Sequence, residues 1–277
     1  MTILVFTLIL LMGAYLAGLL GSLTGLGGGV IIIPLLTLGF HIDFHYAIGA
    51  ALVGSIATSS GSASAYVKEG ITNIRLGMFL EVATTMGAVV GAMLAMYMPI
   101  NAIAIIFGCV LIFSSLMTVR KKSEHVVHKG SKLAYDLKLN GSYPTPGGAM
   151  DYELKNVAGG FSIMALAGVL SGLLGIGSGA VKVLAMDGAM RVPFRVSTTT
   201  SNFMVGVTAA ASAVVYLQRG YIDPGIAFPV VVGVLAGAFS GTKLLMKINV
   251  KWLRIIFSTA IALIAMQMIY SGFNNKF

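Results

Sequence analysis

Apolar runs separated by short polar turns follow one another along almost the whole chain. A run of about 20 such residues is long enough to cross the hydrocarbon core of a bilayer as a helix. We expect five apolar segments in each half of the chain, over residues 3–23, 28–40, 44–67, 75–97 and 101–119, and over 157–175, 179–190, 194–217, 224–246 and 251–271. The short alternating segments of a membrane β-barrel are not visible. The pattern therefore predicts an all-α polytopic membrane protein.

The second segment of each half is too short to cross a bilayer. About 11 helical residues rise only about 17 Å, which is roughly half the hydrocarbon thickness. We therefore expect half-helices here, preceded by glycine turns that lie at membrane depth. Each half would then contain about five segments, which gives either eight full spans with short half-helices or ten spans.

The two halves of the chain resemble each other at a constant shift of 150 positions. Residues 17–29 (AGLLGSLTGLGGG) align without a gap with residues 167–179 (AGVLSGLLGIGSG). The same shift pairs further small and aromatic residues, among them Phe44 with Phe194, Thr58 with Thr208, Tyr66 with Tyr216, and Gly91 with Gly241. Two membrane units that are each broken by glycines are typical of a secondary transporter. We expect one repeat over residues 1–119, a linker over 120–156, and a second repeat over 157–277.

Basic residues in the loops predict that the two repeats have opposite orientations. They are Lys68, Arg75 and residues 120–122 in the first repeat, and Arg191, Arg195 and four residues between 243 and 254 in the second. In the first repeat these residues follow the third and fifth apolar segments. In the second repeat they follow the second and fourth segments. An inverted second repeat would bring them all to one face, which the positive-inside rule assigns to the cytoplasm. The linker would lie on that face as a loop.

Composition agrees with a membrane protein and excludes several other classes. Hydrophobic residues make up 57% of the chain and charged residues 10%, with a mean hydropathy of +0.93. A soluble domain has about 25% charged residues. We attribute the net charge of +9 to membrane orientation and not to nucleic acid. The single Cys109 allows no disulfide within the chain, and the first apolar stretch lacks the basic start of a cleaved signal.

Alternating glycines mark the first candidate binding region in each repeat. Such glycines let the chain leave the helix and expose backbone N–H groups, which favour an anion where a helix begins. Two turns from inverted repeats could converge near the midplane on one ligand. The residues concerned are Gly25, Gly27, Gly28, Gly29, Gly175, Gly177, Ser178 and Gly179. Close helix packing is the alternative role of small residues, and we prefer it for Gly18, Gly87, Gly91, Gly168, Gly237 and Gly241.

Polar and ionisable residues inside the apolar segments supply the other candidates. Hydroxyl and amide groups at Thr199, Thr200, Ser201 and Asn202 could bind an oxyanion or cap a helix, and the corresponding residues 49–52 of the first repeat are apolar. Lys182 follows the second glycine turn and could neutralise an anion there. Glu81 could face water or reach Lys182 at a similar depth, and its protonation could couple transport to a proton gradient.

Other classes of function find less support. An intramembrane enzyme needs a nucleophile with a base at membrane depth, and no histidine lies in the interior of any apolar segment. His41 with His45, and His125 with His128, have spacings that could bind a metal, but we interpret them as solvated loop residues. We therefore expect no catalytic residue, no metal site and no cofactor. An anion channel stays open as an alternative to a transporter.

At these residues the chain resembles the TauE/SafE sulfite-exporter family. The resemblance is carried by Gly25–Pro34, Gly175–Val183, Thr200–Ala210 and Tyr216–Asp223, and it covers nearly everything outside the central linker. It implies a permease of the cytoplasmic membrane that exports sulfite or small organosulfonates. The chain departs from the family pattern at Ser178, which replaces a glycine, and at residues 50–51, where alanines replace Thr-Ser.

Together these features predict an inverted-repeat secondary transporter that exports a small anion, most simply sulfite or an organosulfonate, by alternating access. Transport of an unrelated carboxylate or metabolite is a second alternative, beside the anion channel. The expected partners are a small oxyanion and the lipid bilayer, without nucleic acid, and a homodimer is one assembly that the sequence allows.

Overall fold

The computed structural model describes residues 3–24, 27–119, 130–145, 148–245 and 250–274. Its helices are α1 (Ile3–Thr24), α2 (Gly29–Pro34), α3 (Phe44–Lys68), α4 (Ile74–Ala95), α5 (Ile100–Val119), α6 (Lys132–Asp136), α7 (Val157–Leu174), α8 (Gly179–Leu184), α9 (Phe194–Gln218), α10 (Pro224–Leu245) and α11 (Val250–Phe273). Five of the described helices are long and apolar enough to cross a membrane. Those stretches are Leu4–Ser22, Ile74–Ala95, Val157–Leu174, Phe194–Gln218 and Pro224–Gly241. The prediction of an all-α polytopic membrane protein is confirmed.

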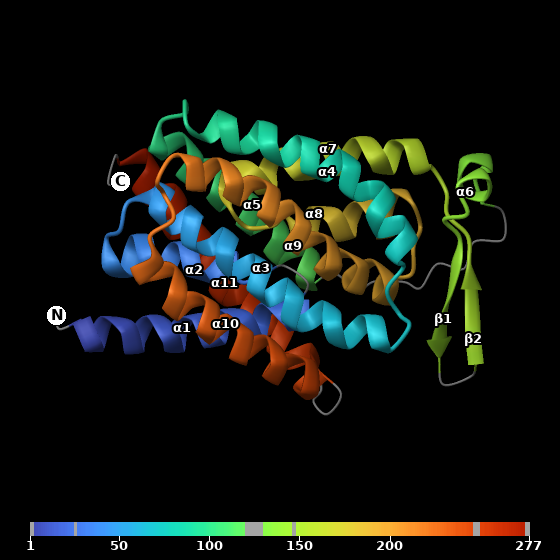
Figure 1. The fold of residues 1–277 in the computed structure, drawn as a ribbon, viewed down its shortest axis with the longest axis horizontal. Coiled ribbons are helices and arrows are strands. Elements are labelled where there is room, and N and C mark those ends of the chain that lie inside the picture. Colours follow the sequence, from blue (N-terminus) through green and yellow to red (C-terminus); the bar gives the residue numbers. More distant parts are fainter. Residues whose placement is uncertain (1–2, 25–26, 120–129, 146–147, 246–249, 275–277) are drawn as a thin grey trace.

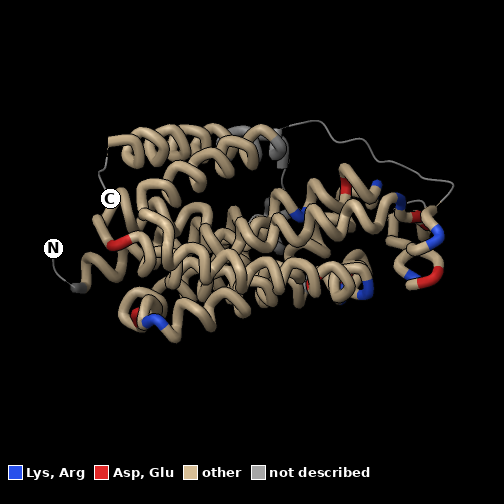
Figure 2. Tube along the Cα trace, turned by 90° about the horizontal axis from the view of Figure 1, so that it is seen from above, with Lys and Arg blue, Asp and Glu red and all other residues tan. Residues whose placement is uncertain are grey.

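Charged residues and apolar side chains are distributed as a bilayer requires. Figure 2 shows most Lys, Arg, Asp and Glu residues near the two ends of the helices, while the middle of the bundle is nearly free of them among the described residues. Large apolar side chains on the outer helices are exposed, for example Leu8 (52%), Met86 (68%), Leu166 (65%) and Phe228 (71%). Lipid chains would cover these surfaces, because the hydrocarbon of a bilayer solvates apolar side chains.

Each long helix of one half packs mainly against a helix of the other half. The principal pairs are α1 with α10, α4 with α7, α3 with α9, and α5 with α11. Figure 1 shows α1 starting at the end marked N and α7 starting at the opposite end, next to the strands, so that the two helices run in opposite directions. From α2 and α8 onwards the corresponding helices also begin 150 residues apart. Two inverted copies related by a twofold axis would produce this exchange of partners.

Glycines allow the paired helices to approach as closely as their backbones permit. A Cβ atom added to Gly18 of α1 would lie 2.1 Å from the carbonyl oxygen of Val234 in α10. The matching contact is nearly identical, because a Cβ atom on Gly168 of α7 would lie 2.2 Å from the carbonyl oxygen of Thr84 in α4. Small residues at such crossings let membrane helices pack by van der Waals contact. The role that we preferred for these glycines agrees with this geometry.

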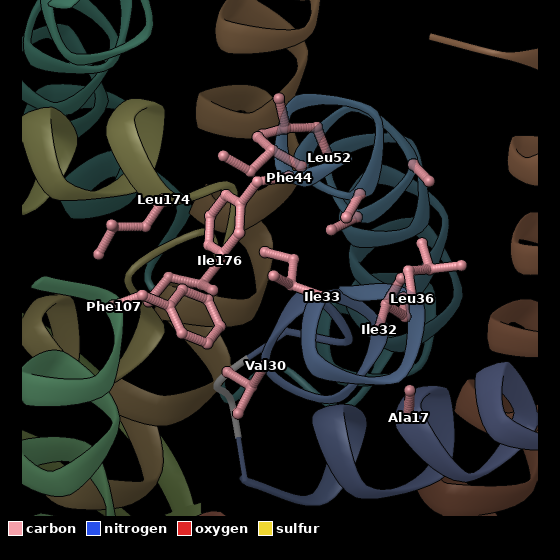
Figure 3. Close-up of a cluster of buried hydrophobic side chains, with 14 of the residues drawn as sticks. Ala17, Val30, Ile32, Ile33, Leu36, Phe44, Leu52, Phe107, Leu174 and Ile176 are labelled. Atoms are coloured by element: carbon pink, nitrogen blue, oxygen red, sulfur yellow. The ribbon is translucent and has the colours of Figure 1, made fainter. Parts of the chain in front are cut away.

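The short second segments are half-helices that change their winding halfway. The α-helices α2 and α8 continue as π-helical segments η1 (Leu35–Gly39) and η2 (Ala185–Ala189). Pro34 ends α2, but Leu184 stands at the same point of α8, so the change of winding does not depend on proline. Figure 3 shows Ile32, Ile33 and Leu36 of the first half-helix inside a buried apolar cluster. Phe44 and Phe107 meet edge to face in this cluster, with ring centroids 6.1 Å apart.

The described part of the linker contains regular structure where we expected a loop. After α6, strands β1 (Gly141–Thr145) and β2 (Gly148–Tyr152) pair antiparallel, with Gly141 opposite Tyr152 and Thr145 opposite Gly148. Figure 1 places this hairpin at the end of the bundle where α7 begins. Basic residues gather at the same end in Figure 2, which agrees with the cytoplasmic side assigned from loop charge.

The close approach of α1 and α10 predicts that Gly237 tolerates no side chain. A Cβ atom there would lie 2.0 Å from the carbonyl oxygen of Tyr15 and 2.7 Å from the backbone nitrogen of Leu19. Gly237→Ala should cost about 1–3 kcal/mol of stability, because one of two backbones must move. Gly39→Ala is the control, since its Cβ atom meets nothing closer than 3.8 Å. Thermal unfolding in detergent should show a midpoint several degrees lower for Gly237→Ala only; equal midpoints would contradict the packing.

Candidate functional site

The two glycine turns touch each other where the half-helices begin. A Cβ atom added to Gly29 would lie 2.6 Å from the carbonyl oxygen of Gly175, and one added to Gly27 would lie 3.4 Å from that of Ile176. Val205 of α9 packs beside both turns. Its Cγ1 atom would lie 3.5 Å from a Cβ atom added to Gly27 and 2.7 Å from one added to Gly177. The structure therefore brings together the turns that the sequence singled out. Gly25 lies outside the described residues.

The backbone of both turns is left-handed at several positions. The φ angle is +79° at Gly27, +67° at Gly175, +68° at Gly177 and +49° at Ser178. Glycine adopts this conformation without strain, whereas a residue with a Cβ atom does so rarely. Ser178 directly precedes α8, yet its hydroxyl makes no capping hydrogen bond to that helix. Its buried Oγ has no hydrogen-bond partner in the described structure, so it is one polar group still free to contact a ligand.

The four polar residues near the start of α9 point to different neighbours. Thr199 donates to backbone carbonyls of its own helix, whereas the Oγ1 atom of Thr200 accepts from the backbone nitrogen of Asn73 (3.1 Å). Ser201 donates to the carbonyl oxygen of Gly179 at 3.2 Å, which ties α9 to the second glycine turn. The Nδ2 atom of Asn202 is buried without a hydrogen-bond partner in the described structure. Among the four, Ser201 contacts the second glycine turn and Asn202 has an unused hydrogen-bond donor.

Lys182 and Glu81 belong to one buried cluster that Thr208 connects. The ammonium of Lys182 donates to the Oγ1 atom of Thr208 at 2.5 Å, and this hydroxyl donates to Oε1 of Glu81 at 2.6 Å. Thr85 also donates to Oε1, at 3.2 Å. Lys182 is fully buried and Glu81 is 7% exposed. The structure thus favours the alternative in which Glu81 reaches Lys182, and an ionised Glu81 would compensate the lysine charge.

The first repeat has no matching ionic cluster. The residues that correspond to Lys182 and Glu81 are Ile32 and Val231, both apolar. Only the threonine is shared, because Thr58 corresponds to Thr208, and its hydroxyl donates to the carbonyl oxygen of Gly54 in its own helix. The two half-helices therefore differ in charge, because α8 carries Lys182 where α2 carries Ile32.

Two residues near these groups escaped the sequence interpretation. Thr208 was noticed only as a repeated residue, although a hydroxyl kept in both repeats was the available signal. Ser55 has a buried Oγ without a hydrogen-bond partner in the described structure. It lies 3.6 Å from the position of a Cβ atom on Gly27. Ser55 carried no signal, because the run of hydroxyls begins after it at Thr58 and its counterpart in the second repeat is the apolar Val205.

Of the two histidines 41 and 45 that we interpreted as loop residues, His41 does lie between η1 and α3, but His45 lies in the first turn of α3. The Nδ1 atom of His45 lies 3.4 Å from Oδ1 of Asp43, and its ring stacks on Tyr221 with centroids 4.8 Å apart. No three His, Cys, Asp or Glu side chains group together in the part of the chain that the structure describes. His125 and His128 lie outside that part.

A bundle of apolar spans that contains half-helices and buried polar groups defines a polytopic membrane protein of the transporter class. Residues 10–268 match the family described as "Sulfite exporter TauE/SafE". The match covers most of the 277 residues, so the chain belongs to this family and is a membrane transporter. The resemblance noted from the glycine motifs is confirmed.

Similar bacterial and archaeal proteins are described as probable membrane transporters. The chain is 27% identical to the probable membrane transporter protein YunE of Bacillus subtilis, over 96% of this chain and 98% of that protein. It is 26% identical to YdhB of the same organism, over 85% and 89% respectively. It is 25% identical to MJ0441 of Methanocaldococcus jannaschii, over 94% of both chains. No solved structure matches the chain.

The bridging position of Thr208 predicts that its hydroxyl holds the charged cluster together. Thr208→Val keeps the shape but removes the group that joins the ammonium to the carboxylate, which leaves both with fewer partners in a buried site. We expect a clear loss of thermal stability in detergent, because unpaired buried charges are costly. The matched control is Thr58→Val, whose hydroxyl bonds only within its own helix. If both variants unfold at the same temperature, the bridge has no stabilising role.

Proposed function

We propose that the protein is a secondary transporter that exports a small anion, sulfite or an organosulfonate, across the cytoplasmic membrane. The contact between the two glycine turns carries this proposal, because it joins half-helices of both halves at one place inside the bundle. The proposed site combines these turns with the groups around them. Its residues are Gly25, Gly27, Gly28, Gly29, Gly175, Gly177, Ser178, Gly179, Lys182, Thr199, Thr200, Ser201 and Asn202.

Unused hydrogen-bonding groups support an oxyanion as the ligand. The buried hydroxyls of Ser55 and Ser178 and the amide of Asn202 have no partner in the described structure. Hydroxyl and amide groups can donate to the oxygens of a sulfite or sulfonate group. Buried polar groups are normally paired, so a ligand that pairs them would recover the cost of their burial. The family description, which names sulfite export, points to the same class of anion.

The exchange of helix partners supports alternating access as the mechanism. We propose that residues 1–119 and 157–277 are inverted repeats joined by the linker 120–156, and that they rock against each other around the contact of the turns. Saturable counterflow of labelled anion in vesicles tests this mechanism against a channel. A channel would conduct without trans-stimulation by unlabelled anion.

The charge of the buried cluster supports a role for Glu81 in coupling. While Glu81 is ionised it compensates Lys182, so the pair offers an anion no net attraction. Proton uptake by Glu81 would leave the ammonium uncompensated and able to attract an anion. Binding of a proton to Glu81 and of an anion near Lys182 would then be linked, which would make transport depend on pH.

Replacing Lys182 should weaken anion binding. Lys182→Ala removes the one buried cation of the proposed site, and we expect a severalfold higher Kd for sulfite, measured by calorimetry on purified protein under argon. Exposed Lys155→Ala is the charge-matched control and should bind as the parent does. The double variant Glu81→Gln/Lys182→Ala leaves no uncompensated charge, so it separates loss of the site from loss of the fold. Unaltered affinity in a folded Lys182→Ala protein would exclude this lysine from the site.

Replacing Glu81 should remove the pH dependence of transport. Glu81→Gln is permanently neutral, so the ammonium of Lys182 is available to an anion at every pH. Uptake of labelled sulfonate into vesicles should then vary little with pH, whereas the parent should transport faster as the pH falls. Thr85→Val, which removes only an accessory hydrogen bond to the carboxylate, should keep the parent profile. An unchanged profile in Glu81→Gln would rule out coupling through this carboxyl group.

A further inference from the structure

A polar cavity lies outside the bundle, between the turn that joins α3 to α4 and the hairpin of the linker. Its volume is about 290 Å³, enough for a small oxyanion with some water. Thr72, Asn73 and Arg75 line it from the side of the bundle, and Lys138, Ser142 and Tyr152 line it from the linker. The linker thus forms one wall of a cavity whose other wall is the membrane domain.

The charge of the cavity favours an anion. Arg75 and Lys138 contribute two cations, and none of the described residues that line the cavity is acidic. The guanidinium of Arg75 donates to the carbonyl oxygen of Lys138 at 3.1 Å, which holds the two basic residues together across the cavity rim. Burial raises the pKa of Tyr152 to about 12, so its phenol is neutral and adds no negative charge at physiological pH.

One polar group of the cavity awaits a partner. The Oγ1 atom of Thr72 is buried and makes no hydrogen bond in the described structure. A hydroxyl can donate to an oxyanion, and a buried polar atom gains most from such a bond. A small anion held by both cations would also satisfy this hydroxyl.

Asn73 connects the cavity to the proposed transport site. Its Nδ2 atom donates to the carbonyl oxygen of Leu139 (2.9 Å) and to the hydroxyl of Tyr152 (2.8 Å), both in the linker. Its backbone nitrogen donates to Thr200 of α9 at 3.1 Å. The neighbouring Ser201 bonds to the second glycine turn. Asn73 in the cavity wall is therefore bonded to Thr200, and the next residue of α9, Ser201, is bonded to the second glycine turn.

We propose that this cavity is a second anion site, which binds a small oxyanion between Arg75 and Lys138 on the face that carries the linker. The anion site stands on the cavity alone. Its further role, to load the transport site from the cytoplasm, rests on the function proposed above. The bound oxyanion is either the transported sulfonate or a free phosphate, which share the same recognition chemistry.

Protection of an engineered cysteine tests the site without measuring transport. Ser142→Cys places a thiol on the exposed part of the cavity wall, in a Cys109→Ala background that removes the native thiol. Its alkylation by neutral N-ethylmaleimide is timed in methanesulfonate, in inorganic phosphate, and in chloride at equal ionic strength. We expect alkylation to slow severalfold in one of the two oxyanions relative to chloride. Stronger protection by methanesulfonate would identify the transported class, and stronger protection by phosphate a regulatory anion.

Charge variants then decide between a specific site and general attraction. Arg75→Gln/Lys138→Gln should abolish the protection. The exposed pair Lys132→Gln/Lys155→Gln changes the net charge equally and should retain it. Lys182→Ala should also retain it, because that lysine belongs to the transport site. No protection in the parent, protection that survives the first pair, or equal loss in both pairs would overturn the second site.

The loading role has its own readout. In oriented vesicles, Arg75→Gln/Lys138→Gln should raise the KM for anion offered on the linker face severalfold, with little change in the maximal rate. The exposed control pair should leave KM unchanged. An unchanged KM together with lost protection would keep the anion site but overturn its role in loading. If Lys182→Ala lost transport but kept the protection, the result would bear on the proposed transport site and would leave the second anion site unaffected.

Discussion

The arrangement of the helices depends on backbone contact between the two halves of the chain. Gly18 against Val234, and Gly168 against Thr84, bring helices of opposite halves to distances that exclude even one methyl group. In a bilayer no hydrophobic driving force joins helices, so such close van der Waals contact must supply the cohesion. The two crossings flank the pair α3–α9, and the half-helix α2 packs on α3 while α8 packs on α9. Changing one crossing would displace the groups that meet at the glycine turns.

Within this nearly symmetric frame, the charged groups are placed asymmetrically. The second half-helix carries Lys182 where the first carries Ile32, and Glu81 faces it from a helix whose counterpart has Val231. Ionisable residues in spans are costly and are usually paired or functional. Thr208 reconciles the two charges by donating to one and accepting from the other. The fold thus offers a neutral cluster whose net charge one proton can change, close to a contact that both halves share.

The linker is part of the molecule's structure as well as a connection. Asn73 caps α4 through its side chain, bonds to the hairpin, and meets Thr200 through its backbone nitrogen. These bonds join the first half, the linker and the second half at one end of the bundle. A rocking motion between the halves would strain or break the bond to Thr200, so the linker is positioned to influence any opening on its own face.

The sequence by itself determined the membrane class, the short second segments and the glycine turns, because hydropathy, length and glycine spacing are local signals along the chain. The constant shift between the halves gave the matching elements, and the glycine motifs gave the family. Only the tertiary structure decided which polar groups meet. Glu81 and Thr208 are separated by 127 residues, as are Asn73 and Thr200, and no local pattern encodes such pairs. The position of Ser55 beside the first glycine turn emerged for the same reason. The β-hairpin is local, since Gly141 pairs with Tyr152, but the turn residues in this segment led us to interpret it as a loop.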